Sequence, residues 1–237
     1  MIIVDNKSFS IGAFLAITFC GVLAMIFSPI YGAGRTGLQF SDDMFNKLSK
    51  GSSYFIPKLQ EENAAFRGKP FAVTLEMEKA AQAETALGVL STAGAQAWAR
   101  GKTMEVSGDL GGLMDKVLAD SDRMYNNDGK AVTAIYGLDE RKVMETWWQI
   151  LERLDKKLKQ AKMIEEAKLV HAVKNKAVET AYNFYTIPPE HIGEKALLVT
   201  GILAFYVLYT LWWGFAIFFL FKGVGLTMHK AKVRKEI

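Results

Sequence analysis

Few residues of this 237-residue chain have the types and spacing that catalysis or metal binding requires. The three histidines, His171, His191 and His229, are far apart in the sequence, and no H-E-x-x-H pattern offers a zinc site. No serine stands in the G-x-S-x-G motif that marks the nucleophile of many hydrolases. We therefore expect a protein without catalytic residues, metal or cofactor, which is not an enzyme.

Two further segments resemble ligand-binding loops only in part. Asp120, Asp122 and Asp128 lack the residue order and the final glutamate of a calcium loop. The glycine-rich segment 108–112 lacks the lysine of a P-loop and the spacing of a dinucleotide-binding motif. A structural turn with close helix packing accounts better for these glycines.

Two long stretches without charge, residues 8–34 and 196–221, determine the class of the protein. A helix rises 1.5 Å per residue, so about 20 apolar residues cross a hydrocarbon core roughly 30 Å thick. The sequence therefore predicts transmembrane helices at residues 10–30 and 195–221. The first stretch also allows a cleaved signal peptide, because Gly32-Ala33-Gly34 offers a cleavage site, but its apolar run is long for a signal.

Basic residues after the second stretch predict the orientation. They are Lys222, Lys230, Lys232, Arg234 and Lys235, against the single acid Glu236. Short basic flanks stay in the cytoplasm, so residues 1–9 and 222–237 are expected there and residues 31–192 outside. The same cations are expected at the membrane surface, where each contributes about 1 kcal/mol of attraction to anionic headgroups.

The central region is close to neutral. Between Gly32 and Glu194 it holds 22 Lys and Arg against 23 Asp and Glu, so the sequence pI of about 9.0 reflects the C-terminal tail. Nucleic acid binding needs clustered cations on a folded domain and is not expected. The single cysteine, Cys20, lies in the first stretch, so the external domain has no disulfide and depends on its core.

Polar aromatic residues lie near the middle of the second stretch. Tyr206, Tyr209 and Trp213 recur at helical spacing, whereas Tyr and Trp of lipid-facing helices prefer the two interfaces. Thr210 and Gly214 add the small surface at which membrane helices touch. These five residues are predicted to pack against another membrane helix, and the first stretch is the simplest partner.

The first half of the external region predicts mixed structure. Residues 71–78 alternate apolar and polar side chains, as in a strand, and Met104 and Val106 indicate a second strand. The alanine-rich segment 79–100 favours a helix between them. This order predicts a small two-strand α/β element with parallel pairing, and a single helix over residues 71–100 stays open as the alternative.

The remaining helices are expected from Ser41, over residues 57–66 and 110–125, and as one long helix over about 139–184. Trp147, Leu151, Leu154 and Leu158 recur along the long helix at coiled-coil spacing. This stripe predicts packing on the helix's own domain, with a coiled coil between two copies as the alternative. Trp147 and Trp148 are also candidates for partner contact; they point about 100° apart, so one is expected in the core and the other against a neighbour.

Together these features predict a mainly α membrane protein with two transmembrane helices that flank a helix-rich extracytoplasmic domain. The expected role is a non-catalytic, twice-anchored subunit or scaffold of a membrane protein complex, with the lipid bilayer and other membrane subunits or a homo-oligomer as partners. The alternative is a sensory or ligand-binding receptor that signals through a separate partner. The cation bias and the lack of N-glycosylation acceptors in the external region favour a bacterial inner membrane.

Overall fold

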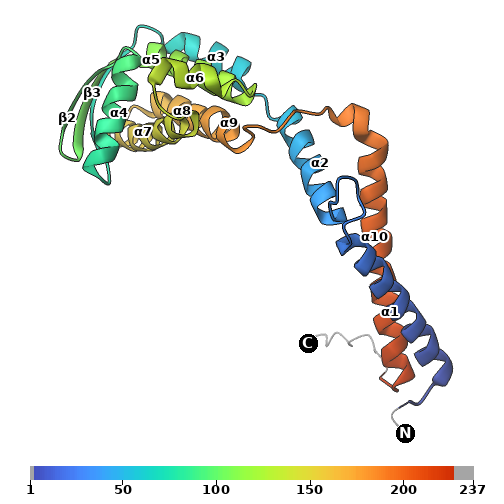
Figure 1. Cartoon of the computed structure of the whole chain (residues 1–237). Coiled ribbons are helices and arrows are strands. Elements are labelled where there is room, and N and C mark those ends of the chain that lie inside the picture. Colours follow the sequence, from blue (N-terminus) through green and yellow to red (C-terminus); the bar gives the residue numbers. More distant parts are fainter. Residues whose placement is uncertain (1–2, 227–237) are drawn as a thin grey trace, which may run out of the picture. The chain divides into compact units, whose positions relative to one another are not determined.

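The computed structural model describes residues 3–226 (Figure 1). They form two compact units: unit 1 holds the residues up to Phe45 and from His191 on, and unit 2 holds Asn46–Glu190. Both units are mostly helical, and within residues 3–226 the strands all lie in unit 2. The predicted helix-rich architecture is therefore confirmed.

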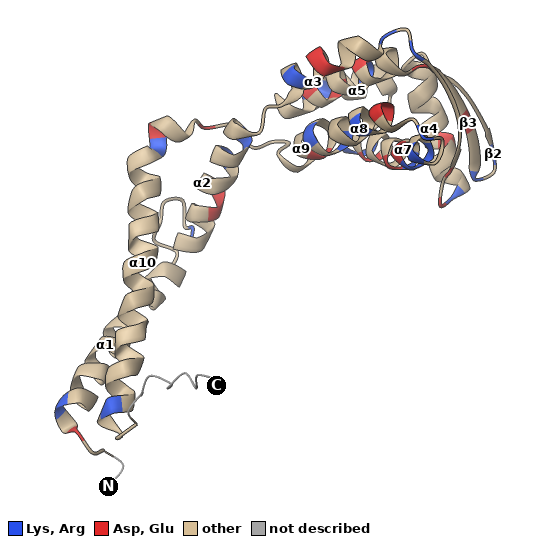
Figure 2. Ribbon diagram, turned by 180° about the vertical axis from the view of Figure 1, so that it is seen from behind, with Lys and Arg blue, Asp and Glu red and all other residues tan. Residues whose placement is uncertain are grey.

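Unit 1 is built on two long apolar helices, α1 (Asn6–Phe27) and α10 (Ile192–Gly223). Both are long and apolar enough to cross a membrane, and Figure 2 shows their charged residues confined to the helix ends. α1 begins where the Asp5 carboxylate accepts the backbone N–H groups of Lys7 and Ser8. Each uncharged stretch thus contains one long helix, although α1 ends three residues before the predicted end at residue 30.

Helix α2 (Gly37–Ser52) leads from unit 1 into unit 2. It begins four residues before the predicted Ser41, because Thr36 and Gln39 form a capping box. Gln39 N–H donates to Thr36 Oγ1 at 3.2 Å, and Thr36 N–H donates to Gln39 Oε1 at 2.9 Å. Such reciprocal bonds satisfy two backbone donors that a helix start leaves open.

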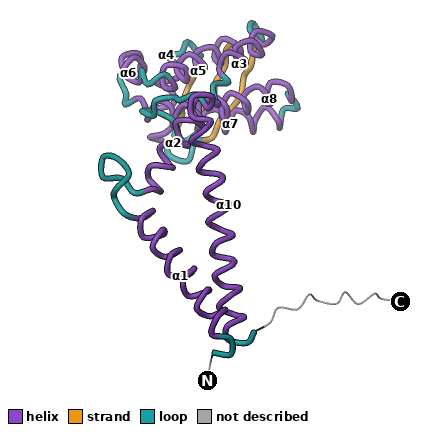
Figure 3. Tube along the Cα trace, turned by 90° about the vertical axis from the view of Figure 1, so that its right-hand side faces the viewer, coloured by secondary structure: helices purple, strands orange, loops and turns teal. Residues whose placement is uncertain are grey.

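Unit 2 contains a three-stranded antiparallel sheet, whose strands are orange in Figure 3. Its strands are β1 (Pro70–Glu76), β2 (Gln96–Arg100) and β3 (Thr103–Asp109), in the order β1-β3-β2. Leu75 pairs with Met104, and both side chains are buried. The two predicted strands are confirmed, but the predicted parallel pairing is wrong.

The antiparallel pairing follows from a strand that the sequence did not predict. Helix α4 (Ala80–Thr92) ends before Gly94, whose φ of +88° only glycine adopts readily. The chain then continues as β2 and turns back at Gly101, with φ +62°, so β2 and β3 form a tight hairpin. Residues 93–100 are therefore not helical, because two glycines reverse the chain where alanine content alone favours a helix.

Two helices follow the sheet, of which the first was predicted and the second was not. The predicted helix 110–125 is α5 (Leu110–Tyr125), and α6 (Gly129–Tyr136) follows it. A Cβ atom on Gly111 would lie 2.3 Å from the backbone nitrogen of Arg67. The glycine-rich segment 108–112 is the end of β3 and the first turn of α5. The predicted close packing is confirmed, but no separate turn lies between the strand and the helix. The helix predicted over 57–66 is α3 (Ile56–Asn63), extended by a 3₁₀ turn over Ala64–Phe66.

The long helix predicted over 139–184 is wrong. The segment forms α7 (Glu140–Gln160), α8 (Ile164–Val173), a π-helical turn (Lys174–Val178) and α9 (Glu179–Asn183). The break between α7 and α8 lies at Lys162, whose φ is +60°. The chain therefore reverses direction after Ala161, and α8 packs against α7.

Helix α7 supplies the centre of the core of unit 2. The side chains of Trp147, Leu151, Leu154 and Leu158 are all at most 1% exposed. The predicted packing of this stripe on its own domain is confirmed, and the stripe is not available for a coiled coil with a second copy. Trp147 donates from Nε1 to Asp120 Oδ2 at 3.0 Å, which satisfies its only polar atom inside the core.

The positive φ of Lys162 generates a prediction. A non-glycine residue in this region costs roughly 1 kcal/mol, so Lys162→Gly should raise the free energy of unfolding by about that amount. Lys156→Gly, at an exposed position inside α7, should lower it by about 1 kcal/mol. Guanidinium unfolding of the full chain in mild detergent, followed by tryptophan fluorescence, measures both. A lower stability of Lys162→Gly would contradict the assigned break.

Candidate functional site

The first candidate is the contact between α1 and α10, where the two backbones touch. A Cβ atom on Gly12 would lie 2.6 Å from the backbone nitrogen of Leu220, and one on Gly223 would lie 2.7 Å from Phe9 Cα. The Gly223 carbonyl accepts the N–H of Val4 at 2.8 Å. Small residues therefore bring the two helices together, as at other membrane helix contacts.

Aromatic stacking extends this contact along α10. The Phe19 ring of α1 stacks on Tyr209 with 4.2 Å between centroids, and it meets Trp213 at 4.6 Å. Two of the five predicted contact residues thus pack on α1. Phe205 stacks on the Tyr209 ring within α10 at 5.4 Å.

The other three predicted residues lie on a flank of α10 that α1 does not cover. Tyr206 is 63% exposed, and open space surrounds Gly214. Together with Thr210 they follow one another at four-residue spacing, which places them along one ridge of the helix. The Thr210 hydroxyl donates to Val207 O of its own helix at 2.8 Å. We call this ridge of Tyr206, Thr210 and Gly214 the open flank.

Helix α1 supplies rings to these aromatic residues but no hydrogen-bond acceptors. Tyr209 Oη and Trp212 Nε1 are buried without a partner among the described residues. The same part of the chain offers no acceptor to Tyr206 Oη or Trp213 Nε1. Four donors in the apolar part of α10 therefore remain open.

The predicted membrane-surface cations are described only in part. Lys222 lies in the last turn of α10 and is exposed. The other four, Lys230, Lys232, Arg234 and Lys235, lie outside the described residues.

The two adjacent tryptophans of α7 divide as expected. Trp147 is fully buried and has no surface to offer a partner, whereas Trp148 is 39% exposed. Trp148 lines a groove between α7 and α9, together with Tyr182. Of the two predicted contact residues in unit 2, Trp148 alone is therefore available.

A buried lysine, whose role the sequence did not predict, forms hydrogen bonds with two distant segments of unit 2. Lys50, in the last turn of α2, is 0% exposed. Its ammonium donates to Asn127 Oδ1 at 2.9 Å and to the carbonyl oxygens of Phe184 at 3.0 Å and Ile187 at 2.6 Å. The Tyr125 hydroxyl donates to the Lys50 carbonyl, and its ring lies 5.0 Å from Lys50 Nζ. We call these groups the lysine clasp.

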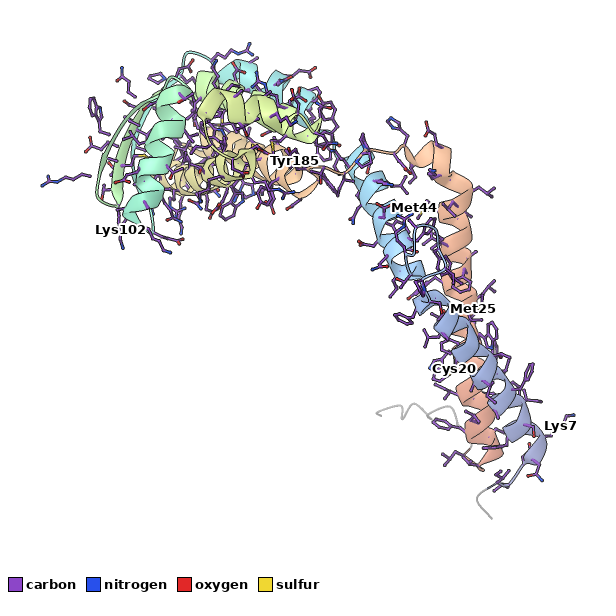
Figure 4. All side chains as sticks on the ribbon, in the orientation of Figure 1. Lys7, Cys20, Met25, Met44, Lys102 and Tyr185 are labelled. Carbon is purple, nitrogen blue, oxygen red and sulfur yellow. The ribbon has the colours of Figure 1, made fainter. Side chains whose placement is uncertain are left out.

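The lysine clasp joins the two ends of unit 2. The Glu190 N–H donates to the Lys47 carbonyl at 3.1 Å, and a Cβ on Gly51 would lie 2.2 Å from the Glu190 oxygen. Tyr185, labelled in Figure 4, donates to Glu140 Oε1 at 2.8 Å and fastens the exit segment to α7. The chain therefore enters and leaves unit 2 at one place.

The remaining candidates for chemistry are held in structural contacts. Asp120 accepts from Tyr136 at 2.5 Å as well as from Trp147, and burial raises the pKa of its carboxyl. Asp122 accepts from the Tyr54 hydroxyl at 2.6 Å. His171 Nδ1 lies 3.2 Å from Asp155 Oδ2. Across residues 3–226 no three His, Cys, Asp or Glu side chains gather as a metal site would require.

Comparison of the chain with protein-family models, curated proteins and solved structures found no match. The function must therefore be argued from the open flank, the groove and the lysine clasp.

The lysine clasp generates a stability prediction. Lys50→Met removes a donor from three partly buried oxygen acceptors and should lower the free energy of unfolding by about 3 kcal/mol, since each unsatisfied group costs roughly 1–3 kcal/mol. Lys58→Met, at a lysine whose side chain is 75% exposed, should change it by less than about 0.5 kcal/mol. Thermal and guanidinium unfolding of the full chain measure both variants. Equal stability of the two would contradict the clasp.

The same lysine predicts a dependence on pH. Burial lowers the pKa of the Lys50 ammonium below its ordinary value of 10.5. Between the two pKa values the unfolded chain binds more protons at this site than the folded chain, so its contribution to the free energy of unfolding rises with pH. Lys50→Met lacks this contribution, so the stability gap between native protein and variant should widen as the pH rises toward 10.5.

Proposed function

We propose that this protein is a non-catalytic, twice-anchored subunit of a membrane protein complex. α1 and α10 cross the membrane, both termini lie in the cytoplasm, and unit 2 lies outside, in the periplasm if the host membrane is a bacterial inner membrane. The short basic end after α10 supports this orientation, because short basic flanks stay in the cytoplasm.

The open flank of α10 carries the proposal. α10 has 26 consecutive residues without charge, from Ala196 to Phe221, so Tyr206 lies within about 5 Å of the middle of this stretch. A phenol there has no water to bind, and an unsatisfied polar group in hydrocarbon costs several kcal/mol. Since α1 packs beside the open flank and accepts no hydrogen bond from Tyr206, a further helix with an acceptor group would satisfy this donor.

The open flank also has the shape that a helix contact needs. Thr210 and Gly214 leave a shallow surface beside the larger Tyr206, and small residues let helix backbones approach closely. Gly12 and Gly223 allow the same close approach between α1 and α10. The partner is thus a membrane helix of another subunit or of a second copy of this chain.

A ligand-binding receptor is the second candidate, and the groove beside Trp148 favours it. Such a receptor would signal through a separate partner subunit. Both roles therefore need the open flank.

The proposal is tested by the size of the complex purified from membranes in mild detergent. Tyr206→Leu combined with Gly214→Leu should release the partner, because it removes one hydrogen bond, worth roughly 0.6–1.7 kcal/mol, and fills the contact surface. Phe215→Leu is the matched control, since Phe215 is 56% exposed and lies on the opposite flank of α10. Light scattering and the list of co-purifying polypeptides give the result. An unchanged mass and partner list in the double variant would refute the proposal.

A further inference from the structure

A groove of about 390 Å³ lies between α7 and α9 on the surface of unit 2. Its lining residues are Met144, Glu145, Trp148, Val178, Glu179, Tyr182 and Asn183. The volume lies within the range of small-molecule sites, roughly 300–1,000 Å³.

The two helices offer the same pair of groups to the groove. α7 places Glu145 three residues before Trp148, and α9 places Glu179 three residues before Tyr182. Residues three apart lie on one face of a helix, so each wall combines a carboxylate with an aromatic ring. Met144 and Val178, both fully buried, form an apolar floor.

The π-helical turn before α9 sets the position of the second wall. The Thr180 hydroxyl donates to the Asn175 carbonyl, five residues back, at 3.2 Å. The wider turn changes the direction of the side chains that follow, so that Ala177 and Ala181 pack in the core while Tyr182 stays 37% exposed beside the groove. Turns of this kind occur frequently at functional sites.

The charges around the groove favour a positive ligand. No Lys or Arg lines it, and the Glu179 carboxylate has no hydrogen-bond or ion-pair partner among the described residues. Glu145 pairs with Lys142 at 3.0 Å, but both side chains are about half exposed, and such surface pairs contribute little. Glu145 also accepts from Gln149 Nε2 at 2.8 Å. Of the two carboxylates of the groove, Glu179 is therefore the one that the described chain leaves without a partner.

The aromatic rings of the groove already attract cations of the chain. The Arg141 guanidinium lies 5.6 Å from the Tyr182 ring centre, and the Lys174 ammonium lies 5.6 Å from that of Trp148. Neither cation lines the groove. A cation held by aromatic faces and carboxylates gains from both interactions.

We propose that this groove binds a small organic cation, an alkylammonium or quaternary ammonium compound. Its nitrogen lies between the carboxylates of Glu145 and Glu179, and its alkyl groups contact the rings of Trp148 and Tyr182. The two rings and the apolar floor favour an organic cation over a divalent metal ion, which is coordinated by oxygen ligands alone. The inference rests on unit 2 alone and is independent of the contacts of α10.

Calorimetry of the full chain in mild detergent tests the proposal with choline and with 3,3-dimethyl-1-butanol, in which a neutral carbon replaces the nitrogen. Choline should bind at least about fivefold more tightly than the neutral analogue. Glu179→Gln and Tyr182→Leu should each weaken choline binding about fivefold or more. Equal binding of the two compounds, or no binding of either, would overturn the proposal.

Two matched variants separate recognition from loss of structure. Tyr182→Phe keeps the ring and should keep choline affinity, whereas Glu84→Gln removes an exposed carboxylate of α4 and should leave the affinity unchanged. The melting temperature of each variant without ligand shows whether it folds. A Tyr182→Phe variant that loses binding as Tyr182→Leu does, with unchanged melting temperature, would exclude the ring as the recognition element.

Discussion

A buried charge with neutral partners holds unit 2 in one arrangement. Removing an ammonium from water costs several kcal/mol, and only well-placed hydrogen bonds offset the cost. The acceptors of Lys50 come from the turn after α5 and from the segment after α9. Both segments must therefore close on the end of α2 before the charge can be buried. One interaction thus ties the last elements of unit 2 to the first and fixes where the chain leaves it.

Much of the fold could be predicted because periodicity and strong turn residues report local structure. Both apolar helices, β1, β3, α3 and α5 follow from such signals. The errors lie where the deciding residue carries no such signal. Lys162 adopts the left-handed conformation that is usual for glycine. Because the sequence has a lysine there, its helical pattern is unbroken and gives no sign that the chain reverses before α8. β2 was missed because alanine content outweighed Gly94 and Gly101, whose positive φ values form the turns around it.

Parts of the candidate site could be predicted from the sequence and parts could not. The contact residues of α10 follow from a local mismatch, polar aromatics in the middle of an apolar helix, and the sequence alone reveals it. The lysine clasp could not be predicted, because its acceptors are mostly backbone carbonyls more than a hundred residues away, which no residue type marks. The groove could be predicted only in part. The repeated spacing of a glutamate and an aromatic residue is visible in the sequence, but the π-helical turn before α9 is not.

The two units differ in whether the hydroxyl and indole N–H donors of their aromatic residues have acceptors. In unit 2 Tyr125, Tyr136 and Trp147 each donate to an oxygen of the same unit. In unit 1 Tyr209 and Trp212 are buried without any acceptor in the described chain. A side-chain donor without an acceptor costs more free energy in hydrocarbon than near water. Among the donors of α10, the hydroxyl of the exposed Tyr206 is the one that a further helix could reach, and it is the observation on which the proposed contact at the open flank rests.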